Sequence, residues 1–208
     1  MYFWPLRKER EARTRQEFPI WKTITLGMCK SPDEYRKALK QARISIGDWG
    51  NDILDRIAYS QEEIEVDLVV VSVSELGFYR SAKYKDLCAK ALELGLQLCP
   101  AEAGPALRLS YKDQPGGERL RIAMKAITSY GCYDSIFEVV HEVELEYEED
   151  ELWLGGNCGV PDIRRRIRSR FVFVRPKPIS VMNLPVFLVS QSLPSCKIMS
   201  GVTKAIPS

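Results

Sequence analysis

The sequence predicts an α+β fold, with two or three N-terminal helices packed on a mostly antiparallel C-terminal sheet. Apolar residues recur at helical spacing in the first half of the chain and alternate with period two after residue 106. The helices therefore precede the strands, which is typical of α+β rather than doubly wound α/β domains. With 208 residues, 45% of them hydrophobic, the chain can bury one core of ordinary size.

The first expected elements are a strand and a helix. Trp21–Leu26 alternates in the manner of a strand and stops at Gly27. Ser31, Pro32 and Glu34 form a capping box, in which the serine hydroxyl accepts a hydrogen bond from a free amide of the first helical turn. One helical face then carries Tyr35, Ala38, Leu39 and Ala42.

Three further elements follow before residue 96. A second cap at Ser45 begins an apolar helical stripe that ends at Ile57. The β-branched run Val66–Val73 favours a buried strand, although a run this short also fits a helix. Tyr84–Leu94 is amphipathic and is closed by Gly95, where a left-handed residue ends a helix.

The remaining elements are expected to be strands. Residues 107–111 and 118–124 flank the turn sequence Asp113–Gly117, which predicts a hairpin. Further strands are expected at residues 135–147, 152–154 and 171–174.

The chain is predicted to divide into a charged N-terminal arm (1–17), a single α+β domain (18–177) and a Pro-containing, poorly ordered tail (178–208). The arm has little apolar periodicity and fits either an exposed helix or a disordered segment. No apolar stretch approaches the roughly 18 residues that cross a bilayer, and no signal peptide is recognisable. We therefore expect a cytoplasmic protein with no membrane association.

Charge is segregated along the chain, although the total is only +2. Residues 134–151 carry nine acidic side chains and no Lys or Arg, whereas residues 162–177 carry seven basic side chains and one acidic one. Blocks of this kind decide which surface meets which partner.

The two blocks have two interpretations. Strand alternation places four glutamates on one face, and an antiparallel pairing with a strand 166–170 would set arginines opposite them. The alternative is a nucleic-acid-binding patch that contacts phosphates. The glutamates are Glu142, Glu144, Glu146 and Glu148, and the patch would comprise Arg164, Arg165, Arg166, Arg168 and Arg170. We take the pairing first, because it explains both blocks at once.

The sequence contains no complete catalytic or metal-binding motif. His141 is the only histidine, and Leu145 occupies the place of the second histidine of an H-E-x-x-H motif. We expect His141 on a half-buried strand face rather than beside a nucleophile. Asp48, Asp52 and Asp55 share a helical face, which is more typical of a solvated surface than of a metal site. No catalytic, cofactor-binding or metal-binding residue is assigned, and no cofactor is expected.

Several stretches together resemble a family of uncharacterised bacterial proteins of domain size, over about residues 18–177. The stretches are Trp21–Gly27, Val66–Phe78, Leu94–Leu109, Asp113–Pro115 and Phe171–Val174. The resemblance implies a bacterial cytosolic setting and no known activity. The family pattern is not Arg-rich at residues 162–169, so the arginine cluster departs from it.

The functional expectation is a non-enzymatic interaction or accessory module with a protein partner. The alternative is a nucleic-acid-binding protein that uses Arg164–Arg170. An enzyme is not the expectation, although a site assembled from scattered Asp, Glu, Tyr and Ser would leave no sequence signature.

Overall fold

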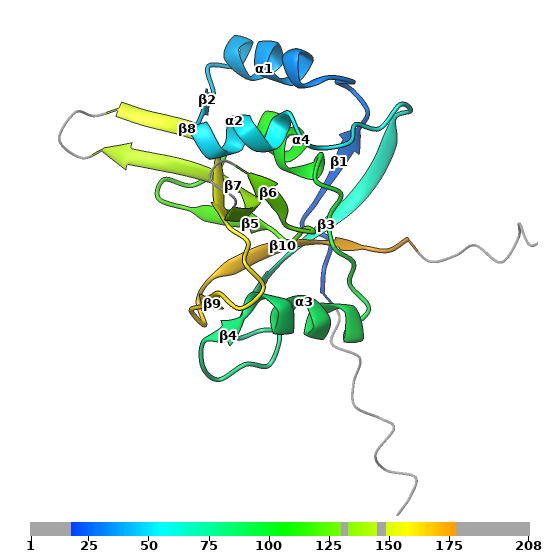
Figure 1. Ribbon diagram of the computed structural model, residues 1–208, viewed down its shortest axis with the longest axis vertical. Helices are drawn as coiled ribbons and strands as arrows, with labels where there is room; N and C mark the ends of the chain where they lie inside the picture. The colour runs from blue at the N-terminus through cyan, green and yellow to red at the C-terminus, as the bar shows by residue number, and fades with distance from the viewer. Residues whose placement is uncertain (1–17, 130–132, 145–148, 178–208) are drawn as a thin grey trace, which may run out of the picture. The chain divides into compact units, whose positions relative to one another are not determined.

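The computed structural model describes residues 18–129, 133–144 and 149–177 (Figure 1). The described residues form an α+β fold, as predicted, in which four helices are interspersed among the strands. The helices are α1 Pro32–Gln41, α2 Asp48–Leu54, α3 Tyr84–Glu93 and α4 Ala103–Ser110. The predicted arm (1–17) and tail (178–208) lie outside the described residues.

Eight of the strands form one curled sheet in the order β1-β3-β10-β5-β7-β8-β2, with β6 added on β7, and β4 pairs with β9 in a second sheet. The strands are β1 Lys22–Leu26, β2 Ser45–Ile46, β3 Ile64–Ser72, β4 Ala82–Lys83, β5 Arg119–Ile122, β6 Ile127–Ser129, β7 Tyr133–Glu144, β8 Glu149–Cys158, β9 Arg164–Arg165 and β10 Arg170–Arg175.

The prediction of N-terminal helices on a C-terminal sheet is wrong in its details, although most strand pairings are antiparallel, as expected. The sheet is mixed, because β10 runs parallel to β5 and β2 runs parallel to β8. It also takes strands from the N-terminal half, since β3 lies between β1 and β10. The physical reason is burial: Leu68, Val69 and Val71 of β3 are almost fully buried, so the backbone donors and acceptors of this strand need a paired strand at each edge.

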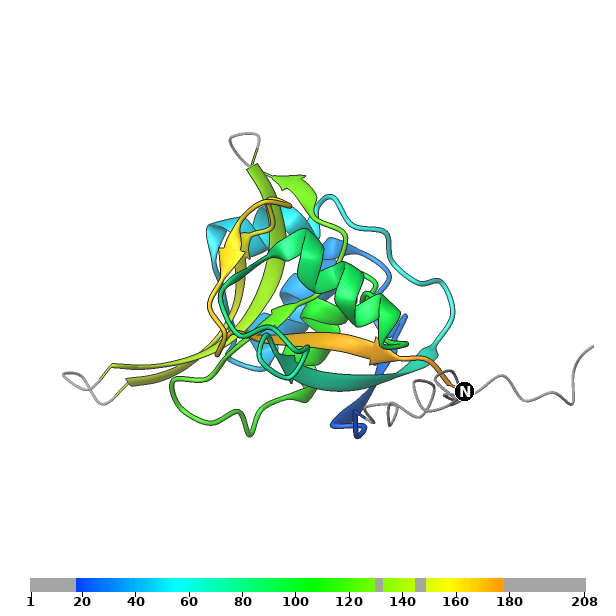
Figure 2. The same ribbon diagram turned by 90° about the horizontal axis from the view of Figure 1, so that it is seen from below.

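The helices cover both faces of the sheet. Figures 1 and 2 show α1, α2 and α4 on one face and α3 on the other. On the second face Tyr84 of α3 stacks on Phe171 of β10, with ring centroids 5.9 Å apart. The Tyr84 hydroxyl also donates to the Met124 carbonyl at 2.7 Å. None of the described helices is both long and apolar enough to cross a membrane.

Several local predictions are confirmed. Helix α1 begins after Ser31, whose Oγ accepts from the Glu34 amide at 3.2 Å. The Glu34 carboxylate binds the Lys30 amide instead of the Ser31 amide, so only half of the capping box forms. Residues 66–73 lie mainly in strand β3, and α3 is followed by Gly95 with φ of 86°.

The helix predicted from Ser45 is shorter than expected. Ser45 and Ile46 form β2, which pairs with Trp153 and Leu154 of β8. The Ser45 hydroxyl donates to Glu151 instead of capping a helix. The pairing of β2 with β8 therefore overrides the local capping signal at Ser45, and α2 begins only at Asp48.

The predicted hairpin of residues 107–111 and 118–124 is also wrong. Residues 103–110 form the buried helix α4, and only the second arm is a strand, β5. Alternation was misleading here because the helix is buried on nearly all sides, including the polar Arg108. The partners of β5 are β7 and β10.

Candidate functional site

Among the described residues, the predicted cross-strand pairing of glutamates with arginines does not form. Within the described residues, β7 pairs with β5, β6 and β8. Residues 166–169 are not a strand, and β10 begins only at Arg170, opposite Ser72 and Leu120. The apolar run 171–174 takes a central place in the sheet, which leaves the arginine run outside it. Glu146 and Glu148 lie outside the described residues.

The arginines line an open groove of about 640 Å³ instead. The parallel register of Arg170 with Leu120 brings the turn before β10 beside the start of β5. Five arginines from these two segments face the groove, with one glutamate among them. The lining residues are Pro115, Gly116, Gly117, Glu118, Arg119, Arg121, Arg166, Arg168, Ser169 and Arg170.

Two of these arginines have no counter-charge among the described residues. The side chains of Arg166 and Arg168 are exposed, and neither makes a hydrogen bond or an ion pair with any residue in the described part of the chain. Their guanidinium groups retain their full complement of donors for a ligand. Two arginines without a counter-charge leave an excess of positive charge at the groove.

Arg170, the first residue of β10, is held in place by an ion pair. Arg170 Nη1 donates to Glu118 Oε1, and the Tyr111 hydroxyl donates to Glu118 Oε2 at 2.8 Å. Burial, together with this hydrogen bond to the carboxylate, raises the pKa of Tyr111 above its ordinary value. The single acidic residue of the lining is thus neutralised by Arg170.

A buried carboxylate orients the two arginines of β5. Glu138 is 4% exposed, and its Oε1 lies 3.0 Å from Arg121 Nη2, while its Oε2 lies 3.8 Å from Arg119 Nη1. Asn157 also donates to Glu138 Oε2, at 3.0 Å. A charge buried at this depth is stabilised only by such partners, so the two guanidinium groups are fixed at the groove wall.

Arg165 belongs to this network and not to the groove. Its guanidinium is buried and donates to Asn157 Oδ1 at 2.8 Å and to the Cys158 carbonyl. Burial, and next the positive charge of Arg121, lower the pKa of Arg165. The Arg165 side chain therefore holds the segment before β10 against β8.

Arg164 also lies outside the groove lining. It is exposed on β9 and donates to the Ser81 carbonyl at 2.9 Å. Of the five predicted site residues, Arg166, Arg168 and Arg170 therefore share the groove, whereas Arg164 and Arg165 do not.

Sequence reasoning missed Arg119 and Arg121. Their spacing placed them on one face of the predicted strand 118–124, so the signal was present. The two arginines were missed because residues 118–124 were predicted to pair with residues 107–111. Strand β5 instead pairs in parallel with β10, next to the arginine run.

An acidic hairpin adjoins the groove. Glu142 of β7 lies directly opposite Glu151 of β8, and Asp150 lies opposite Val143. The Glu142 carboxylate is 2.5 Å from Arg119 Nη2 and so faces the groove wall. Figures 1 and 2 show this hairpin extending away from the helices.

His141 has a structural position, on a strand with its side chain 15% exposed. Its Nδ1 is 2.5 Å from the Gln114 carbonyl oxygen, and its backbone binds Gly117 and Glu118. These contacts fix the loop that forms one wall of the groove.

Two of the three aspartates predicted to share a helical face, Asp52 in α2 and Asp55 just after it, pair with arginines. Asp52 binds Arg56 at 3.0 Å, and Asp55 binds Arg36 at 2.8 Å. Within the described ranges, no group of three or more His, Cys, Asp or Glu side chains could hold a metal ion.

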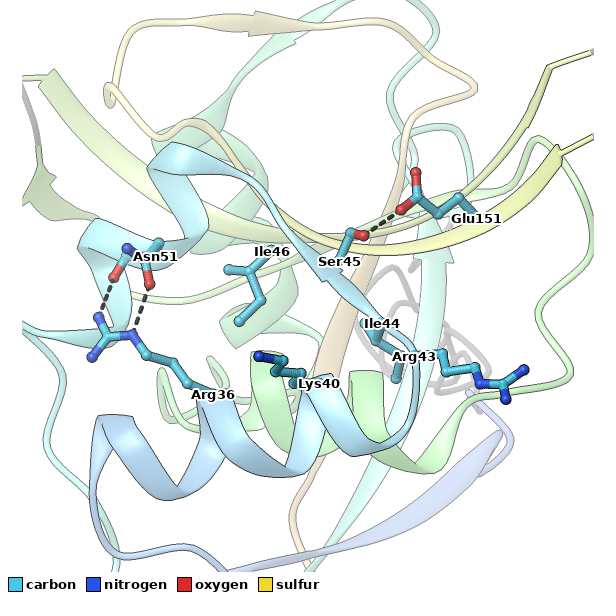
Figure 3. A pocket seen from close by; sticks show the side chains of 8 residues that line it. All are labelled: Arg36, Lys40, Arg43, Ile44, Ser45, Ile46, Asn51 and Glu151. Atoms are coloured by element: carbon cyan, nitrogen blue, oxygen red, sulfur yellow. Dashed lines mark hydrogen bonds between the residues drawn. The ribbon is translucent and has the colours of Figure 1, made fainter. Parts of the chain in front are cut away.

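A second depression, of about 560 Å³, lies between α1 and β2 (Figure 3). Arg36 lines it but is already bound to Asn51, Asp33 and Asp55. Lys40 and Arg43 reach it from the exposed end of α1, and Glu151 places a carboxylate in it. This mixture of charges is less selective for anions than the arginine groove.

Comparisons with protein-family models, curated proteins and solved structures give no match for this chain. The resemblance to the bacterial family therefore stays a prediction.

Proposed function

We propose that this chain is a non-enzymatic interaction module that binds nucleic acid through the arginine groove. The observation that carries the proposal is the position of Arg166 and Arg168, which are exposed and unpaired within the described residues, in a groove that three other arginines share. The cross-strand pairing that would have neutralised them is absent from these residues.

The chemistry of the groove favours phosphate as the recognised group. Guanidinium groups bind phosphate oxygens in a bidentate manner, and they remain charged at all physiological pH values. The groove is open rather than enclosed. An open basic groove suits a chain of phosphates, because each arginine can meet a successive one.

The fixed side chains support the same proposal. Arg119 and Arg121 are oriented by Glu138, and Arg170 is held by Glu118. Their side chains have lost rotamer entropy before any ligand arrives, which lowers the cost of binding.

Binding is tested by fluorescence anisotropy of a labelled oligonucleotide over a series of salt concentrations. Each phosphate contact contributes about −0.7 to the slope of log K against log salt for a single strand. The double variant Arg166→Ala/Arg168→Ala should weaken binding and reduce that slope by about 1.4, if each arginine contacts one phosphate.

The matched control is Lys37→Ala/Lys40→Ala. Both lysines are exposed on α1, so this variant removes the same charge from a different surface. It should leave the slope nearly unchanged. Equal effects of the two double variants, or binding that ignores salt, would exclude the groove as the site.

A basic protein is a second candidate partner, favoured by the acidic hairpin. Asp150 and Glu151 are exposed on this hairpin, and their negative charge would attract a cationic partner. Titration with a fluorescent Lys-rich peptide tests this candidate. Binding of the peptide but not of the oligonucleotide would favour it over the groove.

A further inference from the structure

One aromatic side chain beside the groove's arginine turn is almost wholly in water. Tyr79 is 96% exposed and lies in the loop that joins β3 to β4. Its neighbours Arg80 and Ser81 are also exposed. Single exposed apolar residues are common, so exposure alone does not indicate a binding role for Tyr79. The position of the ring relative to the arginines is the further evidence.

The loop that carries Tyr79 runs beside the arginine turn and is bound to it at both ends. The Ser74 amide donates to the Ile167 carbonyl at 3.0 Å, and Arg164 Nη1 donates to the Ser81 carbonyl at 2.9 Å. Figure 1 shows the loop before β4 next to β9. Along the chain, Tyr79 thus lies between two residues, Ser74 and Ser81, that contact the segment carrying Arg166 and Arg168.

The loop is built to hold the tyrosine outward. Leu76 is buried and Phe78 packs against the core, which fixes the residues before Tyr79. Gly77 has φ of 93°, and its amide donates to the Ser74 carbonyl at 2.9 Å in a tight turn. An exposed ring on an anchored turn is a preformed stacking surface.

The groove's dimensions and surroundings favour one strand over two. Its volume of about 640 Å³ falls within the roughly 300–1,000 Å³ of small-molecule sites, so it has room for a nucleotide unit. No described helix contributes to its lining, so it offers no recognition helix to enter a major groove. Glu142 at the adjoining wall would repel a second phosphate chain.

We infer that the occupant of the groove is single-stranded nucleic acid, and that Tyr79 stacks on a base while the arginines contact the phosphates. This inference rests on the proposed function and names its substrate class. Single-strand binding surfaces combine a basic groove with aromatic rings, because every base has a face on which to stack.

The experiment compares one mixed-sequence oligonucleotide of about 12 residues with the same oligonucleotide annealed to its complement. Tyr79→Ala should weaken single-strand binding by about 5- to 150-fold, the usual contribution of one stacked base. It should change duplex binding less than twofold. Because no phosphate contact is removed, the salt slope should stay as in the unaltered chain.

Two further variants separate stacking from loss of structure. Tyr79→Phe keeps the ring and should retain most of the affinity. Tyr133→Ala removes another exposed tyrosine, at the start of β7 and outside the groove lining, and should have no effect.

The outcomes distinguish this inference from the proposed function. Salt-sensitive binding that Tyr79→Ala does not weaken overturns the role of the ring and leaves the groove as a phosphate site. A duplex that binds as tightly as the single strand overturns the substrate class. If neither probe binds the unaltered chain, the proposed function fails, and this inference fails with it.

Discussion

At the scale of single residues, one buried carboxylate, that of Glu102, holds several segments of the fold together. Glu102 is 1% exposed and accepts hydrogen bonds from the Gly27 amide at 2.8 Å, the Tyr35 hydroxyl at 2.9 Å and the Ser60 amide at 2.8 Å. Burial and the nearby carboxylate raise the pKa of Tyr35, which therefore remains a hydrogen-bond donor. One side chain thus joins β1, α1 and the segment before β3.

Glu102→Ala is expected to destabilise the fold by about 2–4 kcal/mol, because it leaves three donors without an acceptor. Urea denaturation measures the change. Tyr35→Phe removes one of those donors and should cost only about 1 kcal/mol. A loss for Glu102→Ala no larger than that for Tyr35→Phe would contradict the role of this carboxylate as a shared acceptor.

Residue patterns in the sequence predicted part of the groove. Arg166, Arg168 and Arg170 were found from the density of positive charge alone. Arg165 was grouped with them, yet it is buried against Asn157, since a run of arginines does not show which member faces inward. Glu138 looked like one acid of an acidic block, and its contacts with β5 depend on a strand register that no local pattern encodes.

At the scale of elements, α1, β3 and α3 were predictable because local and tertiary preferences agree there. Capping and spacing define α1, and the β-branched run of β3 lies where burial needs it. In α4 the two preferences diverge: residues 107–111 alternate, but residues 107–110 belong to a helix that packs against β7. The contact of Gly104 with Phe137 shows why the helix can lie so close.

Gly104→Ala tests that contact. An added Cβ would lie 2.5 Å from Phe137 Cδ2 and 2.8 Å from Phe137 Cβ, so rotation of the ring cannot relieve it. Although alanine favours a helix by about 1 kcal/mol, we expect a net loss of about 1–3 kcal/mol in thermal or urea unfolding.

The double variant Gly104→Ala/Phe137→Leu provides the comparison. If the clash is the cause, adding Gly104→Ala to Phe137→Leu should cost less than adding it to the unaltered chain. Stabilisation by Gly104→Ala alone would mean that α4 lies farther from β7 than described.

At the scale of the whole molecule, the small total charge of +2 conceals two surfaces of opposite sign. They do not cancel as paired strands. The basic surface is neutralised only in part, by Glu118, Glu138 and Glu142, and each of these acids also orients an arginine. The acidic hairpin therefore limits the groove on one side while it helps to position the groove wall.

Glu142→Gln separates these two effects. For a phosphate placed about 7 Å from the Glu142 carboxylate, removing the unit charge relieves roughly 0.6 kcal/mol of repulsion in water. We therefore expect about threefold tighter oligonucleotide binding at 50 mM salt, and the gain should shrink at 300 mM salt as screening shortens the range of the field. The exposed residue Glu62, in the segment before β3, provides the control Glu62→Gln with the same change in charge. Equal gains from both variants would assign the effect to total charge, and weaker binding by Glu142→Gln would show that positioning Arg119 matters more than repulsion.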